Sequence, residues 1–167
     1  LIAYQNFVED LRMVKDKDEL ILIEQAEAIG DMAFKNILSF IKVGVKEKDL
    51  ALELDYQMRK LGASGNSFET IVASGYRGAL PHGIASEKVI EDGDLVVMDF
   101  GCFYQGYASD MTRTVGVGKV SQKAREVYQV VLEAQLHALE GIKAGLKGKE
   151  IHFIAEKVID EAGYGAY

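Results

Sequence analysis

Hydrophobic residues recur at spacings of three and four in two stretches of the first half of the chain, which predicts two amphipathic helices. The first is expected to begin at the acidic run of residues 16–19, where the helix macrodipole favours negative charge, and to continue to about Ile41. The second is expected from about Glu47 to Leu61, with Gly62 just past its end. The predicted buried positions are Leu22, Ala26, Ile29, Ala33, Ile37 and Phe40 in the first helix and Leu50, Leu54 and Met58 in the second.

The same helical period returns in the last 50 or so residues of the chain. Ser121 is a good N-cap for a third helix. A fourth helix is expected from about Lys149 to Ala162, closed by Gly163. The predicted buried face of the third helix comprises Val127, Val131, Ala134, Ala138 and Ile142.

The middle of the chain has a pattern that suits strands. Residues 94–115 contain two runs of aromatic and β-branched residues on either side of the turn signal Gln105-Gly106, so we predict a β-hairpin. A shorter strand is expected within residues 67–75. A loop follows over residues 75–83, with three glycines and the only proline of the chain.

The hairpin carries two acidic residues, Asp99 in its first run and Asp110 in its second. If the turn is Tyr104-Gln105, the two aspartates lie directly opposite; if it is Gln105-Gly106, Asp110 faces Gly101, two residues along on the same face. Either turn brings the carboxylates together, with roughly 5 to 8 Å between their Cβ atoms. A three-residue loop would send them to opposite faces unless a bulge restored the register.

Two carboxylates that converge from an apolar strand repel each other and lose hydration, so a proton or a cation must come between them. Oxygen ligands suit Mn²⁺, Mg²⁺ or Ca²⁺, and Zn²⁺ or Co²⁺ if a histidine joins the site. The alternative is that one aspartate is a turn or strand-end residue paired with Arg113 or a backbone amide. The spacing alone leaves both interpretations open.

Three histidines and one cysteine are the other candidates for chemistry. His82 lies in the loop between Pro81 and Gly83, where it is either a binding residue or a solvated side chain, and the local sequence does not decide between these. His137 and His152 are interpreted as surface or helix-packing residues. Cys102 follows a glycine in an apolar strand and is interpreted as a buried, inert thiol.

Composition limits the class of protein and its partners. The chain has 167 residues, of which 49% are hydrophobic and 27% charged, as in a globular domain. The formal net charge of −7 argues against nucleic acid or an anionic membrane as the main partner. A single cysteine cannot form an internal disulfide, and no signal peptide or long apolar run is present, so a cytoplasmic location is expected.

Two segments of the chain are related by an internal repeat. Residues 41–50 align with residues 142–151, and Gly62 aligns with Gly163, at a constant offset of 101. This pattern indicates duplication of a two-helix unit. The first copy leads into the strands, whereas the second reaches Tyr167 where its strands are expected to begin, so we predict an incomplete second half. Residues 1–12 are interpreted as the tail of an upstream domain or a linker.

Four motifs together resemble the catalytic domain of prolidase and aminopeptidase P, within the pita-bread metallopeptidases that include methionine aminopeptidase. The motifs are FETIVASG at residues 68–75, LPHG at 80–83, LVVMDFG at 95–101 and SDMTRT at 109–114. The resemblance covers residues 13–167. It implies an α+β pita-bread fold of two related halves, with antiparallel strands inside and helices outside. Residues 13–118 would form the first half, and residues 119–167 the helices of the second.

The resemblance also implies a site with two divalent metal ions, Mn²⁺ as the first choice and Zn²⁺ or Co²⁺ as alternatives. Asp99 matches the family's first aspartate, which chelates one metal, and Asp110 matches the second, which bridges both. The family's remaining ligands, a histidine and two glutamates, would lie beyond Tyr167. His82 matches a histidine that is not a ligand but hydrogen-bonds the substrate and stabilises the tetrahedral intermediate.

The implied activity of the intact parent is hydrolysis of the Xaa-Pro bond at the N-terminus of dipeptides or short peptides by a metal-bridging hydroxide. Such a parent is expected to be a homodimer. This fragment alone is expected to bind metal weakly or not at all and to be inactive. The alternatives are a methionine aminopeptidase and a non-catalytic pita-bread domain that binds peptides or histones.

Overall fold

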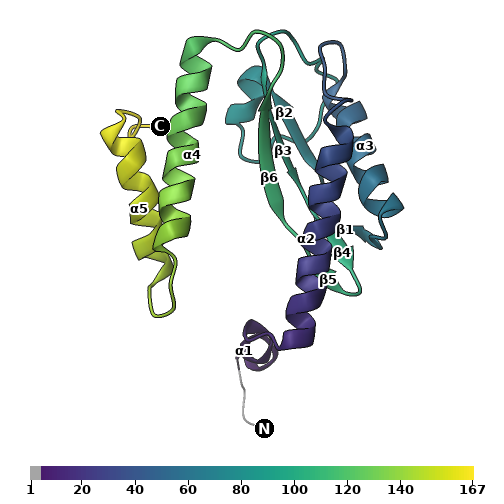
Figure 1. Ribbon diagram of the computed structural model, residues 1–167, viewed down its shortest axis with the longest axis vertical. Coiled ribbons are helices and arrows are strands. Elements are labelled where there is room, and N and C mark those ends of the chain that lie inside the picture. The colour runs from purple at the N-terminus through teal and green to yellow at the C-terminus, as the bar shows by residue number, and fades with distance from the viewer. Residues whose placement is uncertain (1–4) are drawn as a thin grey trace. The chain divides into compact units, whose positions relative to one another are not determined.

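The computed structural model describes residues 5–167, which divide into two compact units, one ending at Lys119 and the other spanning Val120–Tyr167 (Figure 1). The helices of the first unit are α1 (Phe7–Met13), α2 (Lys17–Ile37), α3 (Glu47–Lys60) and the 3₁₀ helix η1 (Gly75–Ala79). Its strands are β1 (Gly65–Asn66), β2 (Ile71–Ser74), β3 (Leu95–Phe100), β4 (Cys102–Tyr104), β5 (Tyr107–Ala108) and β6 (Met111–Gly116). The second unit contains α4 (Gln122–Gly141) and α5 (Gly148–Glu161).

Helix α2 begins where the acidic run predicted. The Asp16 carboxylate accepts hydrogen bonds from the backbone N–H groups of Asp18 and Glu19, both at 2.9 Å, and the Glu19 carboxylate accepts one from the Asp16 N–H at 2.8 Å. This reciprocal capping box satisfies three N–H groups at the helix start. The helix ends at Ile37, four residues before the predicted end, and is followed by turns.

The segment before α2 is only partly described. The predicted tail or linker of residues 1–12 includes residues 1–4, which lie outside the described part of the chain. From Phe7 the chain forms the short helix α1. None of the helices within residues 5–167 is both long enough and apolar enough to cross a lipid bilayer.

Helix α3 confirms the predicted stripe, since Leu50, Leu54 and Met58 are all fully buried. Gly62 follows its end with φ of 109°, a backbone conformation that favours glycine at a helix C-terminus. One feature of α3 was not predicted: Glu47, its first residue, is also fully buried.

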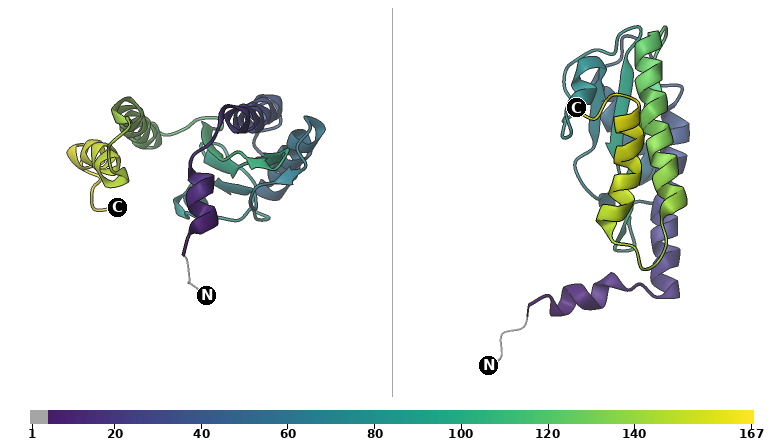
Figure 2. Two further views of the ribbon diagram at one scale, coloured as in Figure 1. Left: turned by 90° about the horizontal axis from the view of Figure 1, so that it is seen from below. Right: turned by 90° about the vertical axis from the view of Figure 1, so that its left-hand side faces the viewer.

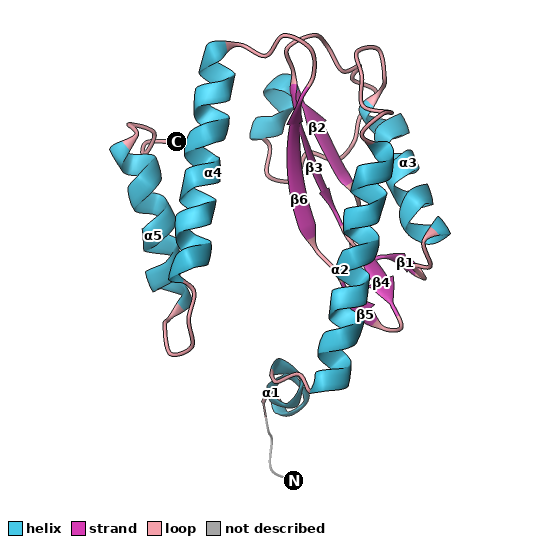
Figure 3. Ribbon diagram, viewed as in Figure 1, coloured by secondary structure: helices cyan, strands magenta, loops and turns pink. Residues whose placement is uncertain are grey.

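The predicted hairpin is present and belongs to two antiparallel sheets (Figure 3). Strands β3 and β6 form one sheet with β2, in the order β2-β3-β6, and strands β4 and β5 form the other with β1, in the order β1-β4-β5. Tyr104 pairs with Tyr107, so the turn is Gln105-Gly106, with φ of 46° and 88°. Both residues have the positive φ that two-residue hairpin turns of this kind require.

Helices α2 and α3 pack on one side of the strands (Figure 2). Val96, Met98 and Phe100 alternate along β3, are fully buried and belong to the same hydrophobic core as residues of both helices. Phe34 of α2 stacks on Phe100 with 6.3 Å between ring centroids. The intervening positions of β3, which include Asp99, are only half-buried and lie on the opposite face of the sheet.

The second unit confirms the two predicted helices but not the whole of the predicted buried face. The Ser121 hydroxyl caps α4 by accepting a hydrogen bond from the Ala124 N–H at 3.1 Å. Ala134 is buried, whereas Val131 and Ile142 are 55% and 58% exposed, so the prediction is wrong at those two positions. In this unit α4 packs against a single helix, α5. In the first unit α3 packs against both a helix and strands, so a wider stripe of its surface is buried.

The internal repeat is visible in the backbone. Helices α3 and α5 begin and end at positions that differ by 101 residues. Their N-cap residues match in conformation, with φ −82° and ψ 149° at Lys46 and φ −82° and ψ 145° at Lys147. Gly44 and Gly145 share a φ of 94°. The predicted α+β class, with a helical hairpin repeated in the two units, is therefore confirmed.

Candidate active site

Asp99 and Asp110 lie on one face of the hairpin. Asp99 of β3 pairs with Thr112 of β6. Beyond residue 101, the pairing of β4 with β5 continues the same register. Extending this register places Asp110 opposite Gly101, so Asp99 and Asp110 are diagonal neighbours, for which a spacing of about 7 to 8 Å is usual. The two-residue turn Gln105-Gly106 thus selects one of the two convergent arrangements that the sequence left open.

In the part of the chain that the structure describes, neither aspartate has a basic partner. The Thr112 hydroxyl donates a hydrogen bond to Asp99 Oδ1 at 2.9 Å, and the backbone N–H of Asp110 donates to Glu27 Oε1 at 3.2 Å. Arg113 instead pairs with Asp31 of α2 at 3.2 Å. Within residues 5–167 neither Asp99 nor Asp110 takes part in an ion pair. The alternative in which Arg113 neutralises one of the aspartates is therefore not realised.

Gly101 lies two residues after Asp99 and opposite Asp110, at a point where the surrounding atoms leave no room for a side chain. A Cβ atom at this position would clash with the backbone carbonyl oxygen of Ser109 and lie 2.5 Å from Ser67 Oγ. The Ser67 hydroxyl donates to that same carbonyl at 2.7 Å, and the Ser109 hydroxyl accepts from the Cys102 N–H at 3.0 Å. Both contacts hold the Ser109 backbone in place, so only glycine fits at residue 101.

Gly101→Ala is accordingly expected to lower the free energy of unfolding by about 2 to 3 kcal/mol, the upper part of the range for overpacking, because the obstructing atom is backbone and cannot rotate away. Chemical denaturation of the purified protein measures this change. Gly65→Ala is the matched control, since its Cβ would meet its nearest neighbour, Arg59 Nη2, at an ordinary 3.7 Å. Equal effects of the two substitutions would contradict the steric explanation.

His82 lies in a loop connected to the same sheet. The loop begins as η1 rather than as the irregular segment expected, and it returns to the sheet at Ile84, which forms a bridge with Ile71 of β2. Ile71 in turn pairs with Asp99 of β3. Ile84 and Asp99 are therefore separated by two strand spacings, or about 9.5 Å. His82, two residues before Ile84, is exposed.

Loop residues also cover part of the face that carries Asp99. A Cβ atom at Gly78 would lie 3.3 Å from Val97 Cγ2, and one at Gly83 would lie 3.0 Å from Ala73 Cβ. Val97 and Ala73 pair with each other across β2 and β3, and Val97 shares its face of β3 with Asp99. The His82 loop and the aspartates therefore belong to the same side of this sheet, opposite the helices.

The loop is held by a residue that sequence reasoning missed. The carboxylate of Glu47 accepts hydrogen bonds from Ser74, Arg77 and Ser86. Burial by itself would raise the pKa of Glu47, but the hydrogen bonds from Ser86 and Ser74 outweigh it and keep the pKa below its usual value. In the sequence Glu47 is one acidic residue at a helix start, where the macrodipole already explains it, so no local signal distinguished it.

The remaining candidates behave as predicted. Cys102 is fully buried as predicted, and burial raises the pKa of its thiol. His137 and His152 are exposed on helices of the second unit. Within residues 5–167 no group of three or more histidine, cysteine, aspartate or glutamate side chains is placed to hold a metal ion.

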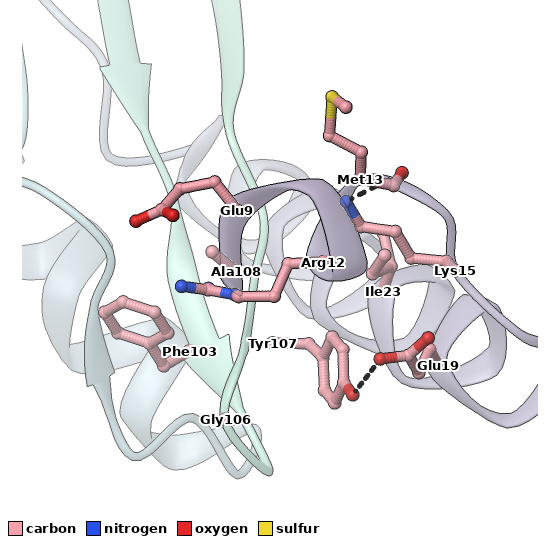
Figure 4. A pocket seen from close by; sticks show the side chains of 10 residues that line it. All are labelled: Glu9, Arg12, Met13, Lys15, Glu19, Ile23, Phe103, Gly106, Tyr107 and Ala108. Carbon is pink, nitrogen blue, oxygen red and sulfur yellow. Dashed lines mark hydrogen bonds between the residues drawn. The ribbon is translucent and has the colours of Figure 1, made fainter. Parts of the chain in front are cut away.

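A separate pocket, with a volume of about 590 Å³, lies among α1, the start of α2 and the β4–β5 hairpin (Figure 4). Arg12 of α1 and Phe103 and Tyr107 of the hairpin are part of its wall. The Tyr107 hydroxyl donates a hydrogen bond to Glu19 at 2.9 Å, which raises the pKa of Tyr107. Asp99, Asp110 and His82 do not line this pocket, so it is distinct from the candidate active site.

The donor set on the hairpin fits part of a metal centre. Asp99 and Asp110 offer carboxylate oxygens on one face of the hairpin, and such oxygens suit Mn²⁺ and also serve Zn²⁺ or Co²⁺. The hydrogen bond from Thr112 orients the Asp99 carboxylate, as groups bonded to metal ligands commonly do. Two carboxylates are fewer than the ligands such ions take, so further donors would be needed to complete the coordination.

Comparison with known proteins gives one consistent result. Residues 21–167 match the profile of metallopeptidase family M24. The chain is 48% identical over 160 residues to a protein of Pyrococcus furiosus named Xaa-Pro dipeptidase. The aligned region covers 96% of this chain and 46% of that protein. The chain spans about half the length of the curated relatives it matches.

Solved structures agree. An Xaa-Pro dipeptidase from Bacillus anthracis has a TM-score of 0.97 at 52% identity, over 99% of this chain and 47% of that one. An X-Pro aminopeptidase from Thermotoga maritima has a TM-score of 0.95 at 48% identity, again over 99% and 47%. The predicted partial pita-bread fold is confirmed by this likeness.

Proposed function

Because this chain belongs to metallopeptidase family M24, we propose that the full-length protein is a metal-dependent peptidase that hydrolyses the bond between an N-terminal residue and a following proline. The resemblance to prolidase and aminopeptidase P is confirmed by the relatives named Xaa-Pro dipeptidase. The observation that carries the proposal is the placement of Asp99 and Asp110 on one face of the hairpin, where no basic residue among residues 5–167 forms an ion pair with either of them.

In this proposal Asp99 and Asp110 hold the divalent ions, with Mn²⁺ as the first choice and Zn²⁺ or Co²⁺ as alternatives. When bound, such ions acidify a water molecule and polarise the scissile carbonyl. The two carboxylates supply the negative charge that retains the cations, and Thr112 fixes the direction of Asp99. No basic side chain within residues 5–167 donates a hydrogen bond to the Asp110 carboxylate, so its oxygens would be available for coordination.

His82 would act on the substrate rather than on the metals. Its loop lies on the same side of the β2-β3-β6 sheet as Asp99, and its exposed imidazole is free to meet a peptide that approaches that side. An imidazole N–H donates a hydrogen bond to a carbonyl oxygen more strongly as negative charge develops on that oxygen. We therefore assign His82 the stabilisation of the charged oxygen formed during hydrolysis.

The test uses the full-length protein, stripped of metal by a chelator and then titrated with Mn²⁺. We expect release of proline from alanyl-proline or leucyl-proline to appear with the metal and to disappear again on chelation. A methionyl-alanyl peptide without proline is the control substrate. Preferential cleavage of that control would favour a methionine aminopeptidase, and no cleavage of either peptide would favour a peptide-binding module.

The chain of 167 residues can be compared directly with the full-length protein. With two carboxylates as its predicted ligands, we expect it to bind Mn²⁺ weakly by calorimetry and to release no measurable proline. Full activity of this chain alone would show that the predicted additional ligands are unnecessary. Assembly of the full-length protein into a homodimer, also proposed, is checked by sedimentation.

A further inference from the structure

A fully buried carboxylate holds both ends of the His82 loop. Glu47 is fully buried at the first position of α3. Its Oε1 accepts hydrogen bonds from the N–H and the hydroxyl of Ser74, at 2.7 and 2.9 Å. Its Oε2 accepts from the N–H and the hydroxyl of Ser86, at 3.1 and 2.6 Å, and from Arg77 Nε at 3.0 Å. Each oxygen therefore binds a different end of the loop.

Arg77 links Glu47 to the backbone of the loop through two hydrogen bonds. While its Nε donates to Glu47, its Nη2 donates to the backbone carbonyl of Ile84 at 2.6 Å. Ile84 is two residues from His82 and forms the bridge that returns the loop to β2. A continuous path of hydrogen bonds thus runs from Glu47 through Arg77 to the backbone beside His82.

A second basic residue supports the same carboxylate indirectly. Lys88 Nζ donates to the Ser74 hydroxyl at 2.9 Å and pairs with Asp94 at 2.7 Å, and both side chains are mostly buried. The Ser74 hydroxyl in turn donates to Glu47. Asp94 immediately precedes β3, so this network also connects the loop to the strand that carries Asp99.

Stability alone does not account for a buried charge here. Removing a carboxylate from water is costly, and a well-packed apolar side chain often stabilises a fold equally well or better. The repeat supplies an internal comparison, since α5 begins at the matching position with Gly148, and a Cβ atom there would meet nothing within 4 Å. The N-cap residues of α3 and α5 have nearly the same conformation, so the helical hairpin itself does not require Glu47.

We propose that Glu47 is a positioning residue for His82, which holds the loop of residues 74–86 in the conformation that presents the imidazole to the substrate. This inference rests on the proposed peptidase function. Glu47 acts only through Arg77 and the two ends of the loop and does not touch the reacting atoms. Its contribution to the reaction should therefore depend on His82 being present.

The kinetic test is a double-mutant cycle in the full-length protein with Mn²⁺ and leucyl-proline. Glu47→Gln replaces one carboxylate oxygen by an amide group that donates hydrogen bonds and therefore faces other donors. The loop is expected to shift as a result. We expect kcat to fall about 10- to 100-fold, as for small misplacements of a catalytic group. The same substitution in a His82→Ala background should cause little further loss. Equal losses in the two backgrounds would overturn the proposal.

Glu87→Gln is the matched control. Glu87 is adjacent to Ser86, and its exposed carboxylate pairs with Lys46 and Lys48 at 3.0 and 2.8 Å, but it contacts neither Arg77 nor Ser74. Its replacement should leave kcat unchanged. Arg77→Lys is the second variant, because lysine can keep the charge beside Glu47 but cannot bond Glu47 and Ile84 together in the same fork geometry. It should reproduce the loss caused by Glu47→Gln.

Amide hydrogen exchange provides a readout that does not need activity. Glu47→Gln is expected to speed exchange within residues 75–86 about tenfold, the factor that corresponds to one lost hydrogen bond. Exchange in α2, to which this network makes no printed hydrogen bond, should stay unchanged. Equal acceleration in α2 would indicate general destabilisation and would refute a positioning role. If the unmodified protein hydrolyses neither peptide, the proposed function fails, while exchange still decides whether Glu47 orders the loop.

Discussion

Asp110→Asn is expected to lower kcat/KM of the full-length protein for an Xaa-Pro dipeptide by more than about 10³-fold, because bound metal supplies several kcal/mol of transition-state stabilisation and each 1.4 kcal/mol is a factor of ten. Asparagine keeps the size of the side chain but removes the negative charge that holds the cation. Metal content by mass spectrometry should fall together with proline release from leucyl-proline.

Asp31→Asn is the control for this substitution. Asp31 is an exposed aspartate of α2 that pairs with Arg113, and exposed ion pairs contribute little to stability. Activity and metal content of this variant should match those of the unmodified protein. Activity that survives in Asp110→Asn would refute the proposed role of Asp110 in holding catalytic metal.

His82→Ala is expected to lower kcat about 10²- to 10³-fold, the usual cost of removing one hydrogen-bond donor from a developing oxyanion. The KM for leucyl-proline should change much less, since the donor is needed mainly when charge develops. Metal content should stay unchanged, because His82 is proposed to contact the substrate and not the metals. Steady-state kinetics and metal analysis of the same preparation measure all three quantities.

His137→Ala provides the comparison for His82. His137 is exposed on α4 and no role is proposed for it, so its removal should leave kcat unchanged. A loss of metal in His82→Ala would instead identify His82 as a ligand. Unchanged kcat in His82→Ala would show that the exposed loop histidine is simply a solvated side chain, the other interpretation that the sequence allowed.

Much of the fold could be predicted from local patterns. The apolar stripe of α3, the start of α2 at its acidic run and the position of the hairpin follow from what each segment requires of its own backbone. The repeat in the sequence, at an offset of 101 residues, correctly relates α3 to α5. Either of the two turns considered, Tyr104-Gln105 or Gln105-Gly106, places Asp99 and Asp110 on one face, because side chains alternate along strands.

Other features required the tertiary structure. The pairing of Tyr104 with Tyr107 identifies the turn. The packing of α2 against the sheets places Asp31 beside Arg113, so that Arg113 pairs with Asp31 and not with the two aspartates of the hairpin. The exposure of Val131 depends on which elements lie beside α4, which a hydrophobic period cannot reveal.

Glu47 is the clearest example of this division. By itself the sequence determined that an acidic residue begins α3, since local spacing and helix electrostatics depend on interactions within the same helix. The folded chain decided that this carboxylate is buried and bonded to Ser74, Arg77 and Ser86, which are 27 to 39 positions away. Contacts at such separations depend on how whole elements pack, so no pattern within one helix contains them.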